Sequence, residues 1–408
     1  MPLSDHSGSS WINMHNDIIA AHHHHGVNTS AQDSAIKSPV RGRNAHIDFL
    51  RGIAILLVLL LHYALAYGLT NCPLRTIAGI NALKAVFYNG NYGVTLFFVI
   101  SGYLITSMSL ARWGEPAYLK MRAFYTYRFA RIMPSILLAL LIIVPLGLLH
   151  VPYFRSAHAG QPMPDSFFLP AVLSILTFWH NVLMQSAGWF NYCLNIYWSL
   201  SVEEVFYLAL PLVFLLLRRK SFIALACLVL IIIGPVYRSW HTDNELFFEC
   251  GYLACFDAIA MGCLTAMLAS RYSLHDRWTI IARATAGIGF VVIYLRGIDT
   301  HEVWGFSLIA LCAAVYIFSS ARDARPGLVT GRAAAGVRWL GRHSYELYLF
   351  HIVVLATLRN VLDREDLPSY AWFPWLMLFL LLSALVAMLV ARFVSEPANR
   401  AIRNYLHA

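Results

Sequence analysis

The chain has 408 residues, of which 59% are apolar and only 12% are charged. Soluble globular proteins are about half apolar and a quarter charged, so this composition argues against an ordinary soluble domain. The formal net charge is +9, but the basic residues lie in clusters between apolar runs. Such clusters are typical of the cytoplasmic loops of membrane proteins, and no basic face suited to nucleic acid is evident.

Residues 1–46 are polar, rich in Ser, Asn and His, and contain no apolar stretch of the kind found in signal peptides. We expect them to form a disordered cytoplasmic tail. The run from His22 to His25 could in principle bind a metal, but it fits a flexible tail better. Residues 47–400 then form the predicted transmembrane domain, and residues 401–408 a second short cytoplasmic tail.

The transmembrane domain contains ten apolar segments close to the length of roughly 17 to 25 residues with which a helix crosses a hydrocarbon core. The predicted fold class is therefore all-α, a polytopic transmembrane helical bundle. The segments are residues 48–67, 88–108, 132–149, 197–217, 221–237, 253–270, 280–295, 304–320, 344–361 and 373–392.

The loops between these segments predict the orientation. Every second loop is basic, for example at Arg218, Arg219 and Lys220, so both termini are expected in the cytoplasm. Residues 170–187 are also apolar, but they include polar side chains, and counting them as a span would invert every later loop. We therefore expect an interfacial or re-entrant segment on the outer side that forms the wall of a cavity.

Charged side chains inside a bilayer are costly and tend to face a cavity or a partner. Arg51 and His62 are eleven residues apart in the first span, so they lie on one helix face and are separated by roughly 16 Å of rise. A single His in an apolar helix is more often a packing residue. The Arg on the same face favours a functional role instead.

Three further groups of residues are candidates. Arg128 and Arg131 are interpreted equally well as cytoplasmic anchors and as a clamp for phosphate. Glu203 and Glu204 lie in the outer part of a span, where at least one is expected to face the cavity and meet His62 or an Arg. Weaker signals are Asp257, which could pair with an inward-facing Arg, and His351 near the start of the ninth span. Ser101-Gly102 is interpreted mainly as a site of close helix packing.

These residues, taken together, resemble the acyltransferase-3 family of bacterial membrane O-acyltransferases. The resemblance extends from Asp48 to about Arg400. The matching motifs are Arg51-x10-His62, the block from Gly93 to Thr106, Arg128-x-x-Arg131, the block from Trp198 to Tyr207, Phe256-Asp257 with Gly262, the block from Ser344 to His351, and Glu396-Pro397. Many members carry Arg two residues before the position of Asp257, where this chain has Cys255.

The resemblance implies acyl transfer, with acetyl-CoA or another acyl-CoA as donor, to a hydroxyl of a carbohydrate or glycoconjugate. It implies that His62 is catalytic and that Arg128 and Arg131 lie on the CoA side, where Arg51 is also a candidate. On this hypothesis His62 acts as general base, and Glu203 or Glu204 orients its imidazole.

The remaining expectations follow from the same hypothesis. Neither a metal nor a tightly bound cofactor is expected. The expected location is the inner membrane, with the lipid bilayer as a partner and no nucleic acid. The alternatives from other classes are a secondary transporter, which would show an inverted repeat, and a non-catalytic membrane sensor.

Overall fold

The computed structural model describes residues 44–113, 121–158, 160–321 and 329–407. All of them belong to the unit Pro39–Ala408, and the unit Met1–Ser38 lies outside the described residues. The predicted N-terminal tail up to residue 43, including the run from His22 to His25, therefore lies outside them as well.

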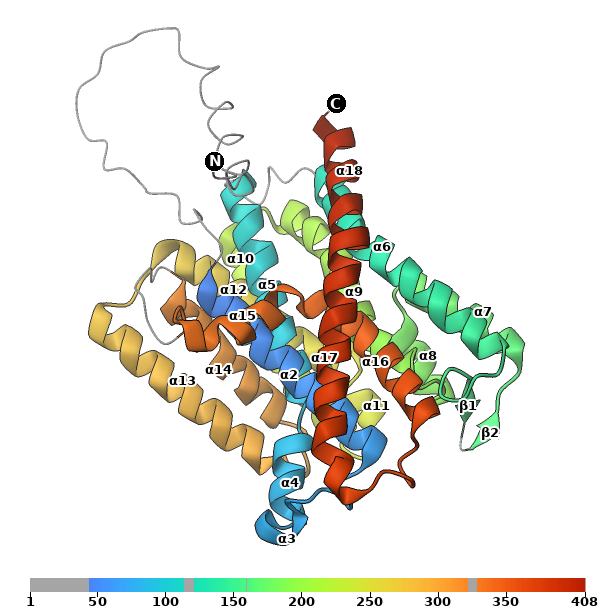
Figure 1. Ribbon diagram of the computed structural model, residues 1–408. Coiled ribbons are helices and arrows are strands. Elements are labelled where there is room, and N and C mark those ends of the chain that lie inside the picture. Colours follow the sequence, from blue (N-terminus) through green and yellow to red (C-terminus); the bar gives the residue numbers. More distant parts are fainter. Residues whose placement is uncertain (1–43, 114–120, 159, 322–328, 408) are drawn as a thin grey trace, which may run out of the picture. The chain divides into compact units, whose positions relative to one another are not determined.

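The described part of the chain is almost entirely helical, as the sequence predicts, and its helices are labelled in Figure 1. Its strands are β1 (Ala157–His158) and β2 (Gln161–Pro162), which pair antiparallel. The helices are α2 (Ala45–Tyr67), α3 (Arg75–Ala78), α4 (Ile80–Phe87), α5 (Asn91–Trp113), α6 (Met121–Leu148), α7 (Phe168–Leu176), α8 (His180–Ala187), α9 (Trp198–Leu217), α10 (Lys220–Ser239), α11 (Glu245–Phe248), α12 (Tyr252–Arg271), α13 (Asp276–Arg296), α14 (Gly305–Ser320), α15 (Ala335–Arg342), α16 (Ser344–Val361), α17 (Trp372–Val390) and α18 (Glu396–His407). Short 3-10 helices are η2 (Asp165–Phe167), η3 (Asn195–Tyr197), η4 (Arg332–Ala334) and η5 (Ser369–Ala371), and η6 (Ala391–Ser395) is a π-helix.

Each of the ten predicted segments coincides with a helix. Eight helical stretches of the described residues are long and apolar enough to cross a membrane. The other two are α14, with 16 residues, and α16, with 18 residues, which fall outside that set. The chain is thus a multi-pass membrane protein, while the count of ten spans and the side of the termini remain predictions.

Three boundaries differ from the prediction or refine it. Helix α6 begins at Met121 rather than at residue 132, because its first turns are compatible with a helix although Arg122, Arg128 and Arg131 interrupt the apolar run. Residues 170–187 form the two short helices α7 and α8, separated by a turn at Phe178, and neither is long enough to span a membrane. Helix α18 continues past residue 400, so the predicted C-terminal tail is helical up to His407.

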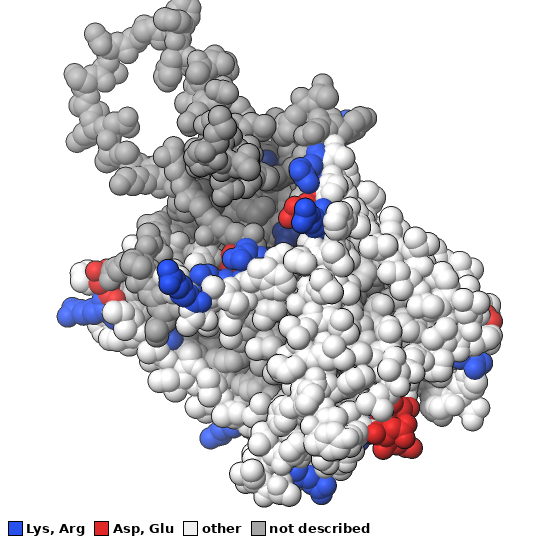
Figure 2. Space-filling view, in the orientation of Figure 1, with Lys and Arg blue, Asp and Glu red and all other residues white. Residues whose placement is uncertain are grey.

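Most of the surface in Figure 2 is formed by uncharged residues. Lys, Arg, Asp and Glu gather toward the margins of the face shown there. An uncharged surface with charged margins is the pattern expected of helices that face lipid along their middle and water at their ends.

Small residues bring the helices into backbone contact. A Cβ atom on Gly102 of α5 would lie 2.0 Å from the carbonyl oxygen of Ile259 in α12. A Cβ on Gly262 of α12 would in turn lie 2.1 Å from the carbonyl oxygen of Val99. This reciprocal contact confirms that the Ser101-Gly102 pair marks a close helix approach.

The C-terminal helices form one continuous rod in Figure 1. Helix α17 passes through the π-helix η6 into α18 without a break. At the end of η6, the hydroxyl of Ser395 lies 2.8 Å from the hydroxyl of Ser135 in α6. The Ser135 residue is fully buried. This contact ties the C-terminal rod to α6.

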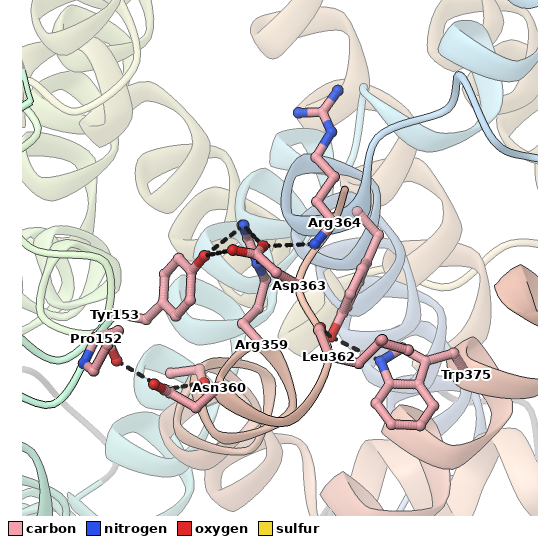
Figure 3. A network of polar contacts seen from close by, with 10 residues as sticks. Pro152, Tyr153, Arg359, Asn360, Leu362, Asp363, Arg364 and Trp375 are labelled. Atoms are coloured by element: carbon pink, nitrogen blue, oxygen red, sulfur yellow. Dashed lines mark hydrogen bonds and ion pairs between the residues drawn. The ribbon is translucent and has the colours of Figure 1, made fainter. Parts of the chain in front are cut away.

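A polar network joins the loop after α6 to the loop after α16 (Figure 3). Tyr153 donates a 2.6 Å hydrogen bond to Asp363, and Arg359 forms an ion pair with the same carboxylate. The Arg359 guanidinium also lies over the Tyr153 ring, 4.2 Å from its centroid. The hydrogen bond from Tyr153, together with Arg359 and the Arg364 amide, lowers the pKa of Asp363 to about 2. The network therefore contains an ionised carboxylate at neutral pH.

Candidate active site

A cavity of about 900 Å³, including its open mouth, lies between α2, α5, α6, α9 and α16. Its wall on α5 runs from Val94 to Met108, which corresponds to roughly 20 Å at 1.5 Å per residue. The polar residues of the lining are Arg51, Ser101, Arg128, Arg131, Ser199, Glu203, Tyr207, Ser344, Tyr345 and Tyr348. The cavity is thus long, and it combines several cationic groups with hydroxyls and one carboxylate.

Arg128 stands at the centre of a charge cluster in this cavity. Its Nε and Nη2 atoms donate to one oxygen of Glu204, at 3.1 and 2.9 Å. Nη2 is also 3.6 Å from a carboxylate oxygen of Glu203, and the guanidinium lies 3.6 Å from the centroid of the Tyr207 ring. Ser101 donates a 2.9 Å hydrogen bond to the other oxygen of Glu203. The cluster therefore connects α5, α6 and α9.

The other two predicted arginines line the same cavity. Arg51 donates to the Ser344 hydroxyl from Nε, at 3.1 Å, and from Nη2, at 2.8 Å, which joins α2 to α16. Arg131 is one helical turn from Arg128 on α6, and its side chain is exposed. The structure thus brings together all three arginines that the sequence assigns to the donor side.

His62 is not part of the lining, but it lies close to one end of the cavity. Gly93, next to Val94, packs on Ala54 and Val58 of α2, and His62 is one turn beyond Val58. The Nδ1 atom of His62 is 2.9 Å from the carbonyl oxygen of Val58. A carbonyl can only accept, so Nδ1 carries the hydrogen and Nε2 has the free lone pair in the neutral ring.

The neighbour of His62 is a second histidine. The rings of His62 and His351 are 4.9 Å apart and nearly perpendicular, at 70°. His351 is fully buried, and its Nδ1 lies 2.9 and 2.8 Å from the carbonyl oxygens of Leu347 and Tyr348. Its Nε2 has no hydrogen-bond partner within the described part of the chain. The sequence signal for His351 is weak, because nothing local shows that it meets His62.

The predicted carboxylate partner of His62 is not found in the described residues. Both glutamates that were candidates for this role bond to Arg128 instead. This satisfies the broader expectation that at least one of them faces the cavity and meets an Arg. Tyr207 and Ser344 also belong to the site, and they stand inside motifs that the sequence already singles out.

A second buried ion pair lies outside the cavity lining. Nη2 of Arg238 in α10 is 2.7 Å from Asp257 in α12, and Ser307 donates a 2.6 Å hydrogen bond to the same oxygen. Neither charged side chain is more than 1% exposed. The expectation that Asp257 pairs with an inward-facing Arg is confirmed. Arg238 supplies this guanidinium from a neighbouring helix, while Cys255 stands two residues before the aspartate.

Comparison with known proteins assigns the family. The acyltransferase-3 family, described as an acyltransferase domain, matches residues 44–392. The chain therefore belongs to this family, as its motifs indicate.

Similar proteins include O-acetyltransferase OatA of Staphylococcus aureus strains NCTC 8325 / PS 47 and COL. Each is 26% identical over 349 residues, which cover 78% of this chain and 54% of the relative. The chain thus spans a little over half the length of these relatives. No solved structure matches the chain significantly.

Proposed function

We propose that this chain is an O-acyltransferase of the inner membrane. It takes an acyl group, in the simplest case acetyl, from acyl-CoA and transfers it to a hydroxyl of a carbohydrate or glycoconjugate. The observation that carries the proposal is the cavity whose lining includes Arg51, Arg128 and Arg131, since a cationic lining suits a donor that carries phosphates. The similarity to proteins named O-acetyltransferases supports the same reaction.

The length of the cavity suits a long donor. Ser101 reaches the Arg128 cluster through Glu203, and it is seven residues from Val94. The cluster and the Val94 end are therefore separated by roughly 10 Å along α5. A donor with its phosphates among the arginines would extend its pantetheine arm toward Val94, the end next to His62.

The chemistry then requires one base. The acceptor oxygen attacks the thioester carbonyl while Nε2 of His62 takes the hydroxyl proton. The carbon–sulfur bond breaks, and the CoA thiolate leaves and receives that proton. The bond between Nδ1–H and the Val58 carbonyl keeps Nε2 available as the base. Base catalysis of this kind contributes typically 10²–10⁴-fold to the rate.

The test uses the purified full chain in lipid nanodiscs, supplied with acetyl-CoA labelled in the acetyl group and with glycan acceptors. We expect label on the glycan and one free CoA thiol for each acetyl transferred. His62→Gln should abolish transfer, whereas His301→Gln, the same change in the loop between α13 and α14, should not. If acetyl-CoA is bound but never consumed with any glycan, the chain is a sensor or a transporter instead.

A further inference from the structure

The Nε–Nη2 edge of the Arg128 guanidinium is already occupied in the structure. Two of its nitrogen atoms bond to Glu204, one of them is also close to Glu203, and the Tyr207 ring covers one of its faces. Its side chain is 18% exposed. A phosphate could bind this edge only by displacing the Glu204 carboxylate.

Arg131 differs from Arg128 in the exposure of its side chain and in the bonding of its guanidinium. It lines the same cavity one turn further along α6, but its side chain is exposed. Within the described residues no hydrogen bond or ion pair joins its guanidinium to another side chain. The Nε–Nη2 pair of donors that matches a phosphate is therefore available on Arg131 and occupied on Arg128.

The charges of the cluster explain why Arg128 is needed all the same. Glu203 and Glu204 together carry two negative charges when ionised, and one of these groups lines the cavity that would receive an anion. Without Arg128 they would repel the phosphates and remain buried without a counter-ion, which is strongly unfavourable. With Arg128 in place, one of these two negative charges is neutralised.

We propose that Arg128 is a positioning residue and not a ligand of the donor. It is the shared counter-ion of Glu203 and Glu204, and through Ser101 the cluster fixes α5, α6 and α9 around the cavity. The two glutamates then act on the donor side through Arg128 and not on His62. Arg131 is the residue that meets the phosphates of the donor. This inference rests on the proposed function, because it assumes an acyl-CoA donor.

The experiment compares binding of acetyl-CoA with binding of S-acetylpantetheine, which lacks the phosphates, to the full chain in nanodiscs. A charged hydrogen bond is worth about 1.5–3 kcal/mol, which corresponds to roughly ten- to hundredfold in affinity. Arg131→Gln should therefore weaken acetyl-CoA binding roughly ten- to hundredfold and leave S-acetylpantetheine binding unchanged.

The matched variant is Arg128→Gln combined with Glu204→Gln, which removes a cation and an anion together. It should keep the wild-type preference for acetyl-CoA over S-acetylpantetheine, and its thermal midpoint should be higher than that of Arg128→Gln alone. Glu204→Gln alone should leave the pH dependence of kcat unchanged, because Glu204 does not act on His62.

The results that would overturn the proposal are distinct. A folded double variant that loses the preference for acetyl-CoA would make Arg128 a phosphate ligand. If Glu204→Gln shifts the pH dependence of kcat, Glu204 acts on His62 after all. If the wild type itself does not prefer acetyl-CoA over S-acetylpantetheine, the assumed donor, and with it the proposed function, fails.

Discussion

Replacing Asp257 with alanine removes the carboxylate that bonds the buried guanidinium of Arg238. Breaking a buried ion pair in this way typically costs about 3–5 kcal/mol, because the remaining charge stays buried without its partner. Arg238 would still donate to the Ser307 hydroxyl and to the carbonyl oxygens of Ala254 and Val303. Since three neutral acceptors remain, we expect the lower end of that range, about 3 kcal/mol.

The chain offers a matched control for this experiment. Arg359 and Asp363 form an ion pair of the same residue types, but their side chains are 15% and 45% exposed. Asp363→Ala should therefore lower the free energy of unfolding by only about 0–1 kcal/mol. The double variant Arg238→Met with Asp257→Leu should recover most of the loss, because no buried charge is left.

The assay is denaturant unfolding in mild detergent, followed by tryptophan fluorescence. Equal losses in Asp257→Ala and Asp363→Ala would show that burial does not decide the strength of these pairs, and the reasoning would fail.

Three more predictions concern the catalytic base, helix packing and pH. His62→Gln should lower turnover by 10²–10⁴-fold while acetyl-CoA affinity stays near the wild-type value, as measured by steady-state kinetics and direct binding; normal turnover would exclude His62 as the base. Gly102→Val should reduce the yield of monodisperse protein in size-exclusion chromatography, because its Cβ would lie 2.0 Å from a backbone oxygen. Gly287→Val should not reduce the yield, because no atom lies within 4 Å of the position of its Cβ. The folded-state pKa of Asp363, about 2, lies below the unfolded value of about 3.9, so its contacts stabilise the protein above pH about 4. The difference in thermal midpoint between wild type and Asp363→Asn should therefore shrink as the pH falls from about 4 toward 2, and a difference independent of pH would refute this assignment.

The helices could be predicted because an apolar run of membrane length leaves the backbone few alternatives. The observed bounds of α16 are those expected from the sequence, and α9, α10 and α12 agree within two residues. The start of α6 could not be predicted in this way. Hydropathy marks where a helix leaves the hydrocarbon and not where its backbone stops being helical, and residues 121–133 contain neither Gly nor Pro.

The candidate site was predictable in its members but not in its pairings. That arginines and glutamates face a common cavity follows from the cost of charge in a bilayer. Which cation Glu203 and Glu204 meet depends on how α6 packs beside α9, because adjacent positions on a helix point about 100° apart. The contact of His62 with His351 joins residues 289 positions apart, and no local pattern encodes it.

The π-helix η6 lies next to α6, which forms one wall of the donor cavity that we propose. A π turn accommodates one residue more than an α turn, so it shifts the phase of the following helix by about 100°. Ser395 is the last residue of this π-helix, and its hydroxyl lies 2.8 Å from that of Ser135 in α6. This contact couples the start of α18 to the helix that carries Arg128 and Arg131. A protein or ligand that binds the C-terminal helix would therefore act, through α6, on the position of the arginines in the donor cavity.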